Sequence, residues 1–318
     1  MGIRGGIDLG GTKIQAVVVS DGADVLGSSR MPTPTSGGPP DVAETMAAAI
    51  RDAATQAGAD TGDLEGVGVG SPGAVSDDEG TVAAARNLPD WEEAYPLRDA
   101  LASRLDTRVR LGNDVQVATD AEFELGAAQQ YNSILGVFWG TGVGGGIVLD
   151  GKPWLGRSAA GEIGHVVVRM GGRRCPCGRR GCMEAYAGRL ALERRARDLE
   201  EKGQSTKLFE IMEERGRDRL TSGVWSRALK AEDAVARKLI HEAVKALGAG
   251  IASSVNLLDV EAVVIGGGMG IRLGEPYVRK IRDAMIPHLF VDSNPPAVQV
   301  AALGDLGGAI GASLLVKQ

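Results

Sequence analysis

The sequence predicts an α/β protein of two lobes built from a duplicated unit. Its 318 residues exceed the roughly 250 to 300 residues at which one hydrophobic core stops growing, so we expect two lobes with a cleft between them. A strand, a Gly-rich turn and a second strand open the chain, and the same pattern returns from Ser133. Two copies of this pattern indicate a duplicated fold.

The first lobe is predicted to open with an antiparallel meander and to continue with alternating helices and strands. Apolar runs predict three strands, over residues 3–9, 14–20 and 25–31. Asp41 and Glu44 form a pattern like a capping box, which predicts a helix to about Gln56 with Gly58 as its end. The remaining elements are a strand over 66–70, a helix near 96–103, a strand over 107–111 and a helix from Asn113 to about 127.

The second lobe repeats the opening and then becomes mainly helical. Its first elements are a strand over 133–139, a Gly-rich turn over 140–146 and a strand over 147–150. Helices follow from Met183, with a long helix over 231–258, then a strand over 262–265 and a closing helix over 306–316. We expect the first lobe to comprise residues 1–112 with 304–318, and the second lobe to comprise residues 113–303.

Composition argues against several classes of partner. The formal net charge of −6 disfavours nucleic acid, because affinity for a phosphate backbone comes from clustered Lys and Arg. The chain has no run of about 18 apolar residues, and its start lacks the cationic and apolar segments of a secretory signal. We therefore expect a cytoplasmic protein with no membrane partner.

The first Gly-rich turn fits the phosphates of a nucleotide. Backbone N–H groups in such a turn reach the β- and γ-phosphates without obstruction by side chains. Gly10 and Gly11 allow this close approach. Thr12 and Lys13 can contact phosphate oxygens, and Asp8 can hold Mg²⁺ directly or through water. A plain hairpin turn is the alternative interpretation.

The second Gly-rich turn, residues 140–146, is assigned to the nucleotide as well. Residues 140–145 also match the G-x-G-x-x-G pattern, but a dinucleotide site requires a helix directly after the glycines. Residues 147–151 instead indicate a strand and a turn, which favours a hairpin. The residues that we assign to the nucleotide in this lobe are Thr141, Gly142, Gly266, Gly267 and Gly268.

All three cysteines of the chain lie within residues 175–182. An odd number of cysteines in a cytoplasmic protein argues against structural disulfides. Tetrahedral zinc needs one ligand beyond Cys175, Cys177 and Cys182, and His165 is the nearest candidate. We therefore expect a zinc loop over residues 165–182. The alternative is a metal-free loop whose thiols are activated by neighbouring arginines.

Two carboxylates flank the expected zinc loop. Glu162 lies three residues before His165, and Glu184 lies two residues after the last cysteine. A hexose presents several hydroxyls, each a donor and an acceptor, so carboxylates and an imidazole suit its pocket. A metal on one ring nitrogen of His165 would fix the tautomer and leave the other nitrogen as a donor. Each glutamate alone also fits a solvated surface position.

Asn113 and Asp114 follow the end of a strand and begin a helix. One interpretation is a helix N-cap. The functional interpretation makes Asp114 the acceptor of the sugar hydroxyl proton as that oxygen attacks the γ-phosphorus, with Asn113 binding a neighbouring hydroxyl. The two interpretations are compatible.

Together these motifs resemble the ROK family (repressor, open reading frame, kinase), and most of all its zinc-containing bacterial glucokinases. The resemblance covers nearly the whole chain. It is carried by residues 8–13, 70–73, 113–114, 140–146, 162–165 and 175–184. It implies the two-lobed actin-like, ribonuclease-H-like ATPase fold with duplicated βββαβαβα-type domains, in which the last helix packs on the first lobe.

The resemblance also implies an ATP-dependent glucokinase that uses Mg²⁺ and holds a structural Zn²⁺. It implies a homodimer or homotetramer, and lobes that close when the sugar binds. It implies Asp114 as general base. The sugar ligands that it implies are Gly73, Asn87, Asn113, Asp114, Glu162, His165 and Glu184. Asn87 is the weakest of these matches, since residues 86–91 fit the family pattern only loosely.

Three alternatives remain open or disfavoured. Kinases of N-acetylmannosamine, N-acetylglucosamine and fructose share the same Glu and His set, so the sugar stays open. Sugar-sensing repressors of the family carry a helix-turn-helix domain before the first strand, for which a strand starting at Ile3 leaves no room. A zinc-ribbon binding module would leave Asp114 and the paired Gly-rich turns unexplained.

Overall fold

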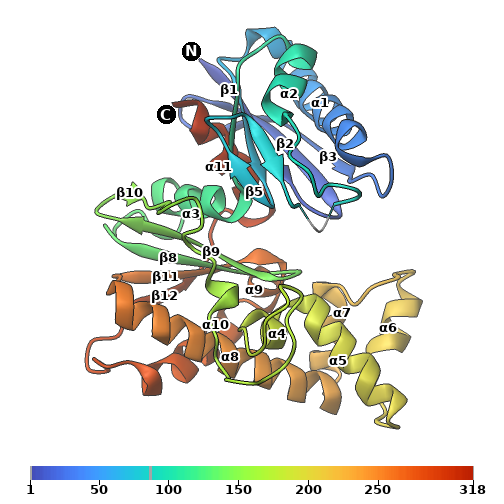
Figure 1. Cartoon of the computed structure of the whole chain (residues 1–318), viewed down its shortest axis with the longest axis vertical. Helices are drawn as coiled ribbons and strands as arrows, with labels where there is room; N and C mark the ends of the chain where they lie inside the picture. The colour runs from blue at the N-terminus through green and yellow to red at the C-terminus, as the bar shows by residue number, and fades with distance from the viewer. Residues whose placement is uncertain (1, 86–87, 318) are drawn as a thin grey trace. The chain divides into compact units, whose positions relative to one another are not determined.

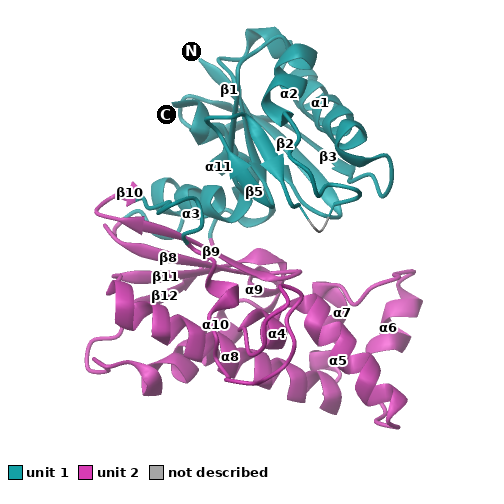
Figure 2. Cartoon of the chain, in the orientation of Figure 1, with its two compact units in different colours: residues 1–129, 153–160, 302–318 teal, residues 130–152, 161–301 magenta. Residues whose placement is uncertain are grey.

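The computed structural model describes residues 2–85 and 88–317 (Figure 1). Contacts divide the chain into two compact units (Figure 2). Unit 1 comprises Met1–Gln129, Pro153–Ala160 and Ala302–Gln318, and unit 2 comprises Gln130–Lys152 and Gly161–Ala301. Unit 1 thus extends past residue 112, where we expected the first lobe to end, because helix α3 (Asp114–Glu124) packs against α11 (Gly307–Leu314) of the same unit.

Unit 1 is a five-stranded mixed sheet with helices on both faces. Its strands are β1 (Ile3–Leu9), β2 (Lys13–Ser20), β3 (Val25–Pro32), β4 (Val67–Ser71) and β7 (Val109–Asn113), in the order β3-β2-β1-β4-β7. The first three strands form the predicted antiparallel meander, and β4 and β7 add in parallel. All five predicted strands of this lobe are confirmed within one to two residues at each end.

Alternation along β2 sends its side chains to two different cores. Ala16 and Val18 join the core under α1 (Gly38–Gln56) and α2 (Leu97–Leu105), whereas Val17 and Val19 pack with α11. On the α11 face, the absence of a side chain at Gly6 allows the helix to pack very close to the sheet. A Cβ at Gly6 would lie 2.0 Å from the Ala309 carbonyl oxygen, so no larger residue fits there.

The capping box predicted from Asp41 and Glu44 for the start of α1 is wrong. The helix begins at Gly38, with Gly37 at φ 87° as its N-cap, and no side chain caps it. Two prolines occupy its first turn, where their fixed φ and missing N–H suit a helix start. Glu44 instead accepts a hydrogen bond from Arg104 Nε at 2.9 Å.

Two short strands of unit 1 were not predicted. They are β5 (Ala74–Ser76) and β6 (Thr81–Ala83), which pair antiparallel after the loop that contains Gly73. Runs of three residues carry too little apolar alternation to be recognised. The helix predicted to reach residue 127 ends at Glu124.

Unit 2 repeats the sheet of unit 1. Its strands are β8 (Ile134–Trp139), β9 (Val143–Leu149), β10 (Lys152–Pro153), β11 (Ala262–Gly266) and β12 (Ala297–Val300), in the order β10-β9-β8-β11-β12. Read in chain order, both sheets have the order third, second, first, fourth, fifth. The predicted duplication is therefore confirmed. The strand expected over 147–150 in fact begins at Val143, so Gly144, Gly145 and Gly146 lie within it.

Helices make up most of unit 2 after Met183, as predicted, although α9, α10 and the strand β12 were not predicted. They are α4 (Glu184–Ala187), α5 (Arg189–Glu201), α6 (Leu208–Glu214), α7 (Ser222–Lys230), α8 (Ala234–Leu258), α9 (Gly267–Leu273) and α10 (Glu275–Met285). The long helix starts at residue 234 and not 231, because Asp233 caps it by accepting from the Ala236 N–H at 2.7 Å. Within the described residues, no helix is long and apolar enough to cross a membrane.

Candidate functional site

The first Gly-rich turn lies between β1 and β2 of unit 1. Its hairpin is closed by the Gly10 N–H, which donates to the Lys13 carbonyl at 3.0 Å, and Gly11 and Thr12 at its tip are exposed. Thr33, a buried residue beyond β3, donates its hydroxyl to the Gly10 carbonyl at 2.6 Å. Thr33 was not among the residues predicted for this turn, because it lies 23 positions from Gly10 in the sequence.

Asp8 is the penultimate residue of β1 and lies beside the first turn of α11. A Cβ at Gly308 would lie 2.8 Å from the Asp8 Cγ, so a methyl group there would displace the carboxyl group. Burial raises the pKa of the Asp8 carboxyl, and the positive charge of Lys13 opposes this rise. A cation beside Asp8 would favour its ionised form, which is the arrangement that a Mg²⁺ role requires. Gly308 gave no signal in the sequence beyond the Gly-rich start of the last helix.

Asn113 and Asp114 occupy the junction between β7 and α3. The Asn113 side-chain oxygen accepts from the N–H groups of Val115 and Gln116, at 3.1 and 3.2 Å, so the N-cap interpretation is confirmed. Asp114 follows as the first helical residue and is half-buried. The positive end of the helix dipole favours a negative charge at this position.

The loop after β4 lies in the same unit as the Asp114 junction. A Cβ at Gly70, the neighbouring position on β4, would lie 3.4 Å from the Asp114 Cα. Gly73 has φ 92°, and a Cβ there would meet the Ala83 carbonyl oxygen at 2.5 Å, so the loop requires glycine. Asn87 lies outside the described residues. Unit 1 therefore contains Asp8, the first turn, Gly73, Asn113 and Asp114.

In unit 2 the structure brings His165 and the three cysteines into one group. Their ligand atoms all lie within 4.8 Å of one another. Cys177 Sγ and Cys182 Sγ are 3.7 Å apart, and Cys175 Sγ is 3.8 Å from His165 Nδ1. With zinc–sulfur bonds of about 2.3 Å, the edge of a tetrahedron is about 3.8 Å, so these spacings are compatible with zinc.

The backbone of the cysteine loop supports this grouping. The Cys175 N–H donates to the Arg179 carbonyl at 2.8 Å, and the Gly178 N–H donates back to Cys175 at 3.0 Å, which makes a tight turn. Gly178 has φ 90°, a conformation that favours glycine. Burial raises the pKa of the Cys175 and Cys182 thiols, whereas hydrogen bonds from the loop, led by the Arg179 backbone, lower the pKa of the Cys177 thiol against its burial. Three sulfurs and an imidazole nitrogen in one group are the donor set of a zinc site. The donor set therefore fits a bound metal better than a reactive metal-free loop.

The two predicted sugar carboxylates lie on either side of the histidine and cysteine group. His165 ends a short 3₁₀ turn, Ile163–His165, and its Nε2 lies 3.8 Å from Glu162 Oε2. Glu184 begins α4 and lies with Oε1 3.7 Å from Cys175 Sγ. With Nδ1 directed to the cysteines, Nε2 remains to donate to a ligand.

Glu184 also joins this group to the second Gly-rich turn. Its Oε2 accepts from the Val143 N–H at 3.0 Å. A Cβ at Gly142 would lie 2.2 Å from the same oxygen, so glycine at this position allows the contact. Thr141 accepts at its hydroxyl from Arg189 Nη2 at 2.9 Å, which attaches the start of α5 to the turn. Gly142 and Thr141 thus have structural contacts of their own besides the nucleotide role predicted for them.

The glycine triplet lies beside the second turn within unit 2. It ends β11 and begins α9, and a Cβ at Gly140 would lie 3.9 Å from the Gly268 nitrogen. Gly267 has φ 76°, and a Cβ there would lie 2.6 Å from the Trp139 carbonyl oxygen, so this turn requires glycine. Gly268 in turn neighbours Ser222 at the start of α7.

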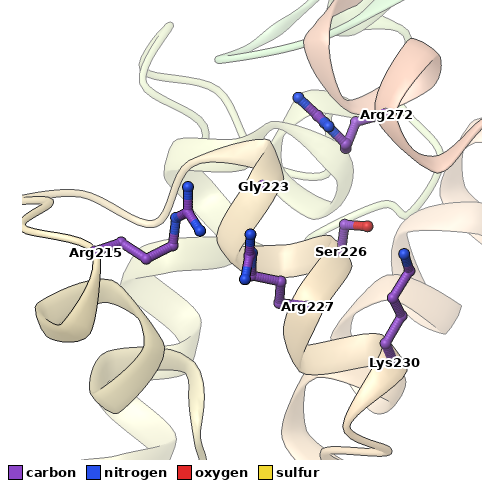
Figure 3. Close-up of a pocket in the computed structure, with 6 residues that line it drawn as sticks. All are labelled: Arg215, Gly223, Ser226, Arg227, Lys230 and Arg272. Carbon is purple, nitrogen blue, oxygen red and sulfur yellow. The ribbon is translucent and has the colours of Figure 1, made fainter.

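A basic cavity opens next to α7 and was not foreseen from the sequence. It has a volume of about 360 Å³ and is lined by Arg215, Gly223, Ser226, Arg227, Lys230 and Arg272. Figure 3 shows Arg215 approaching from the end of α6, Arg227 and Lys230 from α7, and Arg272 from α9. These cations come from three separate segments of the chain, so no single local motif could reveal the cavity.

Comparison with known proteins identifies the lineage of this chain. The ROK family matches residues 4–318. The chain belongs to the ROK family. Kinases of this family have the actin-like ATPase fold, so the fold class expected from the sequence is confirmed.

Individual relatives include sugar kinases of known name. A glucokinase of Thermotoga maritima is 32% identical, in an alignment that covers 98% of this chain and 96% of the relative. An N-acetylmannosamine kinase of Haemophilus influenzae is 30% identical, in an alignment that covers 98% of this chain and 94% of the relative. A crystal structure of a ROK family glucokinase from Streptomyces griseus with glucose and AMPPNP is 32% identical, covers 100% of both chains and has a TM-score of 0.84.

Proposed function

We propose that this ROK protein is an ATP-dependent hexose kinase that transfers the γ-phosphoryl group to the 6-hydroxyl of glucose. The observation that carries the proposal is the group around His165, in which one ring nitrogen is directed to the cysteines and the other lies 3.8 Å from Glu162. An imidazole donor and carboxylate acceptors held in fixed positions suit the hydroxyls of a sugar ring. The named glucokinase relatives support glucose.

In this proposal Asp114 is the general base. The 6-hydroxyl oxygen attacks the γ-phosphorus, its proton passes to the Asp114 carboxylate, and ADP leaves with the electrons of the broken P–O bond. Asn113 uses its amide N–H groups for a neighbouring hydroxyl, since its oxygen already caps α3. The sugar ligands are those that the resemblance implied, with Asn87 the least supported.

ATP is proposed to contact both Gly-rich turns and the glycine triplet. The first turn and Lys13 hold phosphates, and Asp8 holds Mg²⁺, which would neutralise charge on the transferring group. The nucleoside end enters the basic cavity beyond Gly268, where a guanidinium plane can stack on a base. We expect Arg227→Ala to raise the KM for ATP several-fold while the KM for glucose is unchanged; an unchanged KM for ATP would remove the cavity from the nucleotide site.

The metal of the histidine and cysteine group is proposed to be a structural Zn²⁺. Three thiolates and one imidazole are the donor set of structural zinc sites, which have no open coordination position. When bound, the ion fastens the loop and fixes the tautomer of His165. The sugar residues act through hydrogen bonds, and the ion takes no part in phosphoryl transfer.

Kinases of N-acetylmannosamine, N-acetylglucosamine or fructose are the runner-up, favoured by the named N-acetylmannosamine kinase relative. A sugar-sensing regulator without catalysis is a weaker candidate, and a homodimer or homotetramer stays a prediction. The deciding experiment is a coupled ADP-release assay with glucose, mannose, fructose, N-acetylglucosamine and N-acetylmannosamine. We expect the highest kcat/KM with glucose; a higher value with an N-acetyl sugar would reassign the substrate, and no ADP release with any sugar would refute the kinase.

A further inference from the structure

Glu122 is a buried acid that the proposed site does not use. It lies on α3, two residues before the helix ends, and its exposed fraction is 2%. Its carboxylate accepts three backbone hydrogen bonds, each of 2.9 Å. The donors are the N–H groups of Ala127 and Ala302 to Oε2 and of Leu303 to Oε1. Within the described residues no cationic side chain pairs with it, so these amides stabilise its charge.

The three donors lie next to two points where the chain passes between the compact units. Ala127 lies two residues before Gln129, the last residue before the first passage, and Ala302 is the first residue after the final return, at 301–302. One carboxylate therefore joins two segments that are about 175 residues apart in the sequence. The approach is close, since a Cβ at Gly126 would lie 2.1 Å from Glu122 Oε2.

We propose that Glu122 is a positioning residue that ties the outgoing and the returning segments into one rigid part of unit 1. The inference rests on the proposed function, in which Asp114 begins the same helix. Eight residues of α-helix separate the two, a rise of about 12 Å. Because a helix transmits displacement along its axis, loosening Glu122 would loosen the register of Asp114 as well.

The contacts are tested first by amide hydrogen exchange on the complete, zinc-loaded protein without sugar. In Glu122→Gln one carboxylate oxygen becomes an NH₂ group, which cannot accept from a backbone N–H. Losing a charge-assisted hydrogen bond corresponds to about a 10-fold or larger rise in local opening. We expect exchange of that order at Ala302 or Leu303. The control is Glu124→Gln, the same chemical change at an exposed residue of the same helix. Exchange equal to that of the control would overturn the proposal.

The positioning role is tested by kinetics, at a temperature where all variants are folded by circular dichroism. We expect kcat of Glu122→Gln to fall about 10-fold or more, with the dissociation constant for ATP unchanged, whereas Glu124→Gln behaves like the wild type. A merely structural role would lower the amount of folded protein and leave kcat per folded molecule unchanged, which would overturn the positioning role. Absence of kinase activity in the wild type would instead refute the proposed function, and the exchange experiment would still test the contacts.

Discussion

Asp120 provides a sharp test of the structure, because its burial costs stability in a way that depends on pH. The side chain lies on α3 with an exposed fraction of 6% and accepts a hydrogen bond from Gln116 Nε2 at 2.6 Å. Burial raises the pKa of the Asp120 carboxyl from 3.8 to about 7, against the opposing effect of the Gln116 hydrogen bond and with a smaller contribution from the charge of Glu124.

The higher pKa in the folded state fixes the sign of the effect. Folded protein holds the Asp120 proton more tightly than unfolded protein, so this group favours folding fully only below pH ~4, the pKa of the unfolded chain. The contribution is lost at about 1.4 kcal/mol per pH unit as the pH rises toward 7, and it is constant above that. The total loss at pH 8 is therefore about 4 kcal/mol.

Asp120→Asn removes this titration and keeps an oxygen for Gln116. We expect the variant to exceed the wild type in free energy of unfolding by about 1.6 kcal/mol at pH 5 and about 4 kcal/mol at pH 8. The assay is urea unfolding followed by circular dichroism across this range. Asp52→Asn, at an exposed residue of α1, is the control. A difference between Asp120→Asn and wild type that stays constant from pH 5 to pH 8 would refute a raised pKa.

Three further predictions concern the proposed catalytic machinery. Asp114→Ala should lower kcat by about 10²- to 10⁴-fold while sugar binding by calorimetry persists, and near-normal kcat would remove Asp114 as the base. Cys177→Ser should reduce the zinc content, measured by metal analysis, from about one ion per chain to almost none. Full zinc content in this variant would refute the ligand set. Gly308→Ala should lower kcat and raise the Mg²⁺ concentration needed for activity, because the added methyl group displaces Asp8. This is expected even though Ala favours helix formation over Gly by about 1 kcal/mol. Kinetics matching the wild type would show that Asp8 tolerates the methyl group.

The fold was largely readable from the sequence where local patterns are strong. The strands of the first meander, the strand β8 and the long helix α8 have clear apolar patterns, and their ends agree with the prediction within three residues. Errors fell where a competing local rule won, as at α1, where two prolines and not Asp41 begin the helix. The helices α9 and α10 and the strand β12 were missed, since glycines and short length weaken their signals.

The residues of the candidate site were likewise predictable where a local sequence pattern marks them and not where distant residues meet. The cysteines and His165 have a spacing that metal chemistry explains, and the structure brings them together. Gly308 and Glu122 act through contacts with residues far away in the sequence, so nothing near them in the chain reveals their role. The basic cavity around Arg227 depends in the same way on how three helices pack.

The placement of α11 has a consequence for how the protein is made. This helix covers one face of the unit 1 sheet, yet it is encoded after the whole of unit 2. A ribosome therefore releases β1 and β2 long before their apolar residues on that face can be covered. Unit 2 is continuous in the sequence except for residues 153–160, so all of its strands and helices are synthesised before α11. Val17 and Val19 of newly made β2 therefore stay without their partners Ala309 and Ile310 until synthesis has passed residue 310.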